Sequence, residues 1–203
     1  MTDVTAHAGD WLSRGAAPPV AVPTESPSIP RLVRRAQRGS RRARARIVAD
    51  LQAPVFRFCR SMLGGEQRAR EATQETALRL LEGLADFRGR SKLQTWALGI
   101  ALNVCREMRR DSAAAGSNHH HTLTDAVESR DPALALGHDE DCARLHAMLR
   151  ALPERQREAV VLRYFEGLSV QQTADAMQCA AGTVKATISQ ALRNLRRQWS
   201  HQP

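Results

Sequence analysis

The stretch SVQQTADAMQCAAGTVKATISQALRNLRR, residues 169–197, predicts two helices joined by a tight turn. Ser169 and Gln172 have the spacing of a capping box, which gives hydrogen-bond partners to two amides at a helix start. Gly182 lies between the helices, where we expect a turn that needs glycine's freedom of backbone angles. The second helix repeats apolar residues on one face, namely Val184, Ile188, Ala191, Leu192 and Leu195. The stretch is therefore typical of a helix-turn-helix.

The other face of the second helix is polar and basic, with short side chains early and arginines late. Such a helix suits a major groove, because its N-terminal part can meet base edges while its end meets phosphates. The candidate DNA-binding residues of this helix are Thr183, Lys185, Thr187, Gln190, Arg193, Asn194 and Arg197. The alternative is an ordinary helical hairpin whose basic face contacts only solvent.

The composition favours a helical, polyanion-binding protein. The chain has 203 residues, a formal net charge of +9 and only 4% aromatic residues. Ala, Leu and Arg dominate and no segment alternates in the manner of a strand, so we expect an all-α fold. Most basic residues are arginines, whose planar guanidinium pairs well with phosphate oxygens. Scattered surface arginines on a protein without such a partner would give the same net charge.

The chain has no sequence feature of a membrane or secreted protein. No apolar run is long enough to span a bilayer, and the N-terminus lacks the pattern of a secretory signal. We therefore expect a cytoplasmic protein with no membrane partner. The cysteines form no Cys-x-x-Cys pair, so we expect reduced thiols at Cys59, Cys105, Cys142 and Cys179.

A run of histidines raises the alternative of a metal-dependent enzyme or redox sensor. His119, His120 and His121 are consecutive, with His138, Cys142 and His146 as further potential ligands. Their spacing matches no structural zinc pattern, and runs of histidine in linkers are more often compositional. We therefore expect no metal and no cofactor.

The chain divides into two helical parts. Residues 1–29 are rich in Pro, Ala, Ser and Thr and are expected to form a disordered arm. Residues 30–110 and residues 140–203 carry helical periodicity, and residues 111–139 lack it. We expect two small helical domains joined by a flexible linker, the C-terminal one a helix-turn-helix.

Several boundaries inside these parts can also be predicted. Gly39-Ser40 either separates two helices or starts the second one, and Gly64-Gly65 ends the apolar segment that follows. Another helix begins at Pro153, and its expected buried residues are Val160, Val161, Tyr164 and Phe165.

Four stretches, in the expected order, resemble motifs of the bacterial RNA polymerase sigma factors of the extracytoplasmic-function group. They are EATQETALRLL at 71–81, FRGRSKLQTWALGIALNVCREMRR at 87–110, LPERQREAVVLRYFEGLS at 152–169 and GTVK at 182–185. The resemblance covers roughly residues 31–110 and 140–198. It implies a protein that binds core RNA polymerase, directs promoter recognition and transcription initiation, and is not an enzyme. It also implies an anti-sigma factor as a further partner.

The resemblance assigns residues of the N-terminal half to two partners. The clamp helices of the polymerase are expected to contact Glu71, Gln74 and Glu75, which would otherwise form a solvated helix surface. The non-template promoter strand and adjoining duplex are expected to contact Arg88, Arg90, Lys92, Asn103, Arg106, Arg109 and Arg110. Asn103 is either such a contact or a satisfied core polar group. For Trp96, a place in the core is favoured over a role in base stacking.

The sequence departs from the family pattern mainly at the recognition helix. Ala180-Ala181 precedes Gly-Thr-Val-Lys where the family often has Ser, and Ala186-Thr187 follows where Ser-Arg is common. Loss of a helix cap and of a phosphate contact should weaken binding of the upstream promoter element. A helix-turn-helix regulator that binds duplex DNA without core polymerase is the nearest alternative function.

Overall fold

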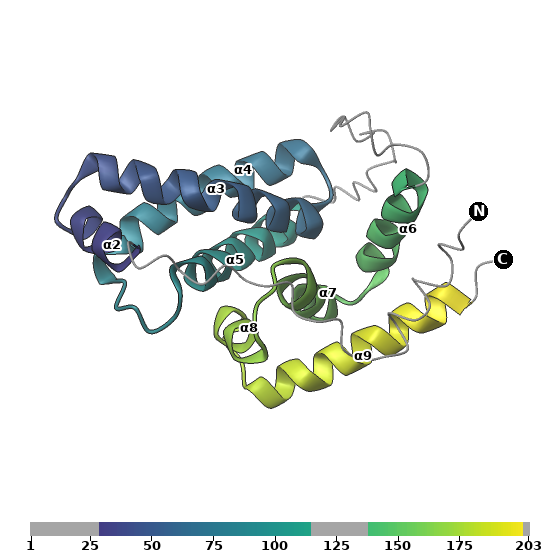
Figure 1. Ribbon diagram of the computed structural model, residues 1–203. Coiled ribbons are helices and arrows are strands. Elements are labelled where there is room, and N and C mark those ends of the chain that lie inside the picture. The colour runs from purple at the N-terminus through teal and green to yellow at the C-terminus, as the bar shows by residue number, and fades with distance from the viewer. Residues whose placement is uncertain (1–28, 115–137, 201–203) are drawn as a thin grey trace.

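The computed structural model describes residues 29–114 and 138–200, and every regular element in these ranges is a helix (Figure 1). The N-terminal helices are α2 (Ile29–Gln37), α3 (Arg41–Leu63), α4 (Glu66–Gly83), the short 3-10 helix η1 (Leu84–Asp86) and α5 (Leu93–Ala114). The C-terminal helices are α6 (His138–Ala151), α7 (Glu154–Val160), the π-helix η2 (Val161–Phe165), α8 (Val170–Met177) and α9 (Ala181–Ser200). The predicted all-α class is thus confirmed. Within the described ranges no helix is both long and apolar enough to cross a membrane.

The breaks between the first helices lie where the sequence predicts them. Ser40 caps α3, because its side-chain oxygen accepts a hydrogen bond of 3.3 Å from the amide of Ala43. Gly64 ends α3 in a left-handed conformation, with φ of 82°, and its amide donates to the carbonyl of Arg60. Glycine adopts this conformation without the steric cost that a Cβ would bring.

The helix-turn-helix consists of α8 and α9, and the capping box at Ser169 and Gln172 is confirmed. The prediction that Gly182 makes the turn is wrong. Gln178 is the turn residue, with φ of 54°, and Gly182 lies in the first turn of α9. A long polar side chain thus accepts a left-handed angle, which the sequence pattern gave no reason to expect.

The helix expected to begin at Pro153 changes its winding after Val160. In η2 the amide of Glu166 donates to the carbonyl of Val161, a bond that spans one residue more than an α-helical bond. The extra residue rotates the following side chains around the axis. Val160 and Val161 are buried as expected, but Tyr164 is only half-buried and Phe165 is 40% exposed. The prediction that Phe165 is buried is therefore wrong.

One apolar core joins the N-terminal and C-terminal helices. Phe58 and Leu102, on α3 and α5, belong to the same buried cluster as Leu162 and Ala174 of the C-terminal helices. α5 lies directly against α8, and a Cβ on Gly99 would lie 3.5 Å from the backbone oxygen of Ala176. A second cluster holds α6 and α9 together and consists of Met148, Leu149, Leu152, Val160, Ala191 and Leu195. The two halves of the chain thus pack side by side (Figure 1).

Candidate nucleic-acid interface

α9 presents its polar face to solvent. Val184 and Ala191 lie on the opposite, buried face. Of the predicted DNA-binding residues, those with exposed side chains are Thr183, Lys185, Gln190, Arg193 and Arg197. Thr187 and Asn194 are half-buried, and Asn194 donates a hydrogen bond of 2.7 Å to the side chain of Gln156. Exposed side chains thus extend along most of this face, with Asn194 anchored to α7.

The loop before α5 holds a second group of predicted residues. Arg88 and Arg90 are exposed, while Lys92 is half-buried. Between the arginines, Gly89 adopts a φ of 68°, a conformation that favours glycine. The start of the loop is held by Gln37, a residue that no sequence motif pointed to. Its side-chain nitrogen donates to the carbonyls of Leu84 at 3.1 Å and Phe87 at 2.9 Å.

Trp96 packs against the core cluster at its edge, so the favoured prediction of a core position is confirmed only in part. It is half-buried, and its ring packs on that of Phe87 with centroids 4.9 Å apart. Trp96 also lines a cleft of about 720 Å³ whose other walls include Asn103, Arg106 and Glu158. The ring thus borders an open space lined by α4, α5 and α7, and it lies so close to Gly83 that a Cβ there would be 3.2 Å from it.

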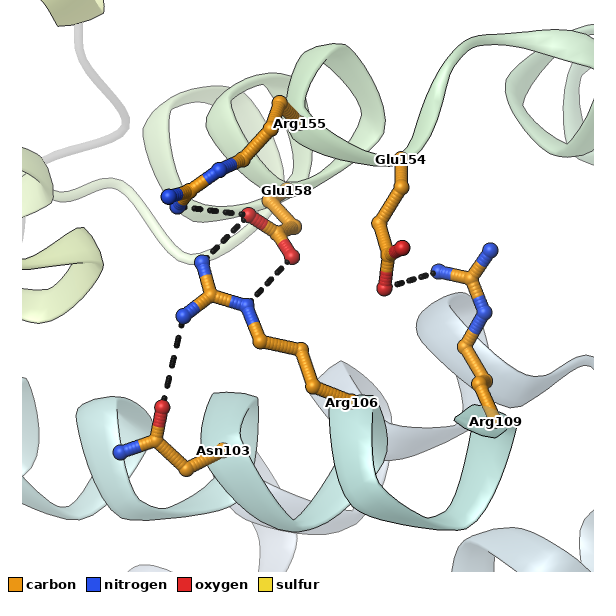
Figure 2. Close-up of polar contacts among 6 residues, drawn as sticks. All are labelled: Asn103, Arg106, Arg109, Glu154, Arg155 and Glu158. Atoms are coloured by element: carbon orange, nitrogen blue, oxygen red, sulfur yellow. Dashed lines mark hydrogen bonds and ion pairs between the residues drawn. The ribbon is translucent and has the colours of Figure 1, made fainter. Parts of the chain in front are cut away.

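Arg106 and Glu158 form the central contact between α5 and α7 (Figure 2). The guanidinium donates from Nε to Oε1 at 2.8 Å and from Nη2 to Oε2 at 2.7 Å, a two-pronged pair of charge-assisted hydrogen bonds. The Glu158 side chain is fully buried, and Arg155 Nη1 lies 3.6 Å from its Oε2. Arg106 Nη1 also donates to Asn103 Oδ1 at 3.4 Å. The predicted DNA-binding residues Asn103 and Arg106 therefore face α7.

Arg109 is the second predicted residue with a partner on α7. Its Nη1 lies 2.9 Å from Glu154 Oε1, as an ion pair without hydrogen-bond alignment (Figure 2). Arg110, the next residue, is exposed. Sequence reasoning missed the roles of Glu154 and Glu158, although their spacing of four places both on one side of a helix.

A further carboxylate, that of Glu166, lies at the contact between η2 and α3. Burial raises the pKa of Glu166 to about 7, and the neighbouring Arg57 lowers it only in part. The two groups are 3.9 Å apart, too far for a hydrogen bond, and Oε2 of Glu166 has no hydrogen-bond partner. The folded protein thus holds this carboxyl group where its charged form is disfavoured.

The predicted polymerase-binding residues lie on α4, away from these contacts. Glu71 and Gln74 are exposed, and Glu75 is half-buried and accepts a hydrogen bond of 2.7 Å from Arg79. Arg79 also pairs with Glu107 of α5 at 2.7 Å. The exposed part of this face is available to a partner.

The metal alternative gains no support from the described residues, among which no three His, Cys, Asp or Glu side chains gather as a metal site. The histidine run at 119–121 lies outside the described residues. Cys59 and Cys105 are buried free thiols, and Cys179 is half-buried.

Comparison with known families matches both halves of the chain. The family model described as Sigma-70 region 2 matches residues 47–115, and that described as Sigma-70, region 4 matches residues 142–195. The RNA polymerase sigma-H factor of Pseudomonas aeruginosa is 35% identical over 79% of this chain and 88% of its own length. The ECF RNA polymerase sigma factor BldN of Streptomyces coelicolor is 31% identical over 87% of this chain and 68% of its own.

The chain belongs to the extracytoplasmic-function sigma factors. It therefore directs core RNA polymerase to promoters and functions in transcription initiation. Two solved structures have a similar fold at 22% identity. CnrH, solved with the cytosolic domain of CnrY, has a TM-score of 0.65 and covers 85% of this sigma factor and 97% of that chain. RpoE of Bartonella quintana, solved with the anti-sigma factor NepR, has a TM-score of 0.58 and covers 77% and 94%.

Proposed function

We propose that this sigma factor divides its work between residues 30–110, which bind polymerase and melted promoter, and residues 140–203, which bind duplex. The observation that supports this most is the separation of two exposed polar faces, Gln74 with Glu71 on α4 and the basic face of α9. The residues between α5 and α6 act as the linker, which is shorter than the predicted 111–139 because α5 extends to Ala114 and α6 begins at His138. The protein works in the cytoplasm and catalyses no reaction itself.

We propose that the single strand contacts the loop with Arg88 and Arg90 and the cleft beside Trp96. Arg106 and Arg109 contact phosphates once they leave Glu158 and Glu154, because a cation paired with a carboxylate cannot also neutralise a phosphate. An acidic protein such as an anti-sigma factor is a further partner, in line with the similar sigma factor solved with NepR.

The clamp assignment is tested by Gln74→Ala combined with Glu75→Ala. We expect this double variant to fold normally, because Gln74 is exposed and the half-buried Glu75 pairs with Arg79 of the same helix, and to bind core polymerase at least 10-fold more weakly. The measurements are affinity for core enzyme and run-off transcription from a promoter fragment. Glu82→Ala, an exposed substitution on the same helix, is the control. Equal affinity of wild type and double variant would refute the assignment.

A further inference from the structure

A basic groove between α2 and α3 has no part in the assignments above. Arg35, Arg42 and Arg46 line it together with Leu32 and alanines of α3, and its volume is about 590 Å³. No Asp or Glu occurs from residue 29 to residue 49. The exposed arginines of this surface are Arg31, Arg34, Arg35, Arg38, Arg41, Arg42 and Arg46. The groove is thus a concave surface with cationic walls and no carboxylate.

The stability of the two helices accounts for only some of these arginines, since Arg34 and Arg35 lie in the last turn of α2, where the helix dipole favours cations. Arg41 and Arg42 begin α3, where the positive end of the helix dipole disfavours cations. Within the described residues the one ion pair of this stretch joins Arg46 to Asp50 at 2.9 Å, and both side chains are largely exposed. Such a pair contributes little, and like charges held together destabilise a fold. The surface therefore favours a polyanion.

Gln37 joins α2, one wall of the groove, to the start of the loop at 87–92. Its bonds to Leu84 and Phe87 join the end of α2 to the point where the loop leaves η1. Figure 1 shows the loop passing close to α2 on its way to α5. Arg38 at the end of α2 and Arg88 of the loop are both exposed, so cations lie on each side of this junction.

We propose that the α2–α3 groove binds the phosphodiester backbone of the single DNA strand that leaves the loop at 87–92. This inference rests on the proposed function, which assigns that loop to the melted strand. Arginine suits the role, because its planar fork donates two parallel hydrogen bonds to one phosphate. Phosphate contacts carry no base information, so the groove adds affinity and holds the strand without changing promoter preference.

The test uses holoenzyme reconstituted from core polymerase and bound to a promoter fragment with a pre-melted bubble. Arg35→Gln with Arg42→Gln removes two groove cations, and Arg60→Gln with Arg70→Gln removes two cations elsewhere, so each double variant lowers the net charge of +9 by two. We expect the groove variant alone to bind more weakly, with a slope of log K against log salt that is shallower by about 1.4. Arg35→Lys with Arg42→Lys should restore most of the slope.

A photo-crosslinking residue at Ala45, on the groove wall, should label the melted strand. An unchanged slope together with no labelled strand would overturn the inference, and so would labelling of a polymerase subunit in place of DNA. The loop variant Arg88→Gln with Arg90→Gln distinguishes failure of the groove inference from failure of the proposed function. If this loop variant binds the bubble weakly while the groove variant matches wild type, only the groove inference fails. If wild-type holoenzyme does not bind the bubble, both fail.

Discussion

The carboxylate of Glu166 has too few hydrogen bonds and cations nearby to offset the cost of burying its charge. Its side chain is 2% exposed, one oxygen lacks a hydrogen-bond partner, and Arg57 lies 3.9 Å away. Burial therefore raises its pKa to about 7 from an ordinary 4.5. Because the folded protein binds the proton more tightly than the unfolded chain, stability falls as the pH rises from about 4.5 to about 7. The cost is about 3 kcal/mol above this range.

Glu166→Gln should abolish this pH dependence, because the amide stays neutral at every pH in the window. We expect wild type to lose melting temperature between pH 5 and pH 8 and the variant to lose much less, so that the variant is the more stable at pH 8. Thermal unfolding at several pH values measures the difference. Glu82→Gln, at an exposed position, should follow wild type. Parallel curves for wild type and Glu166→Gln would contradict the assignment of the raised pKa.

Among the elements, the segment from α7 to α8 contains one feature that the local sequence determines and one that it does not. The capping box of α8 follows local chemistry, since both of its hydrogen bonds lie within a four-residue stretch. The π-helical turn of η2 has no local pattern of its own. It places Leu162 in the core shared with α5 while Phe165 faces outward. Packing against the N-terminal helices therefore offsets the poorer helical geometry of this turn.

Ser169→Ala removes the cap of α8 and should destabilise the protein by about 1 kcal/mol. The amide of Gln172 loses its partner at 3.1 Å, and α9 depends on α8 for its position. Chemical denaturation followed by circular dichroism measures the loss. Ser189→Ala, in the exposed middle of α9, is the matched control and should be neutral or slightly stabilising. Equal midpoints for both variants would argue against the cap.

In the whole molecule, the packing of the two halves brings carboxylates of α7 into ion pairs with arginines of α5. Glu158 is fully buried and pairs with the partly buried Arg106. Glu154 pairs with Arg109 at 2.9 Å. The proposed phosphate ligands of α5 are thereby occupied from within the same chain. The shared apolar core supports this closed arrangement, so under the proposed function promoter DNA would have to compete with burial as well as with charge.

Glu158→Gln should loosen this contact, because the partly buried Arg106 would be left beside a neutral partner. We expect a larger radius of gyration in small-angle scattering and tighter binding of the free protein to melted promoter DNA. Glu154→Gln should have a smaller effect, since that side chain is 43% exposed. Unchanged scattering and DNA affinity in Glu158→Gln would show that the ion pair does not hold the halves together.

The amino-acid sequence alone was enough for features that depend on near neighbours. The helices, the cap at Ser169, the glycine end of α3 and the apolar face of α9 all follow from spacings of a few residues. The family resemblance likewise depended on short motifs and is confirmed. The individual polymerase and DNA contacts stay predictions. Gly182 failed as a turn residue because Gln178, four residues earlier, adopts the left-handed angle that ends α8.

Features that depend on distant partners emerged only from the folded chain. Arg106 meets Glu158, which is 52 residues away, and Gln37 meets Phe87, which is 50 residues away. No helical periodicity relates such pairs, because periodicity describes one element and not how two elements dock. The exposure of Phe165 and the pKa of Glu166 depend on the same docking. Burial and charge pairing are properties of the assembled helices, so they cannot be read from the residues in order.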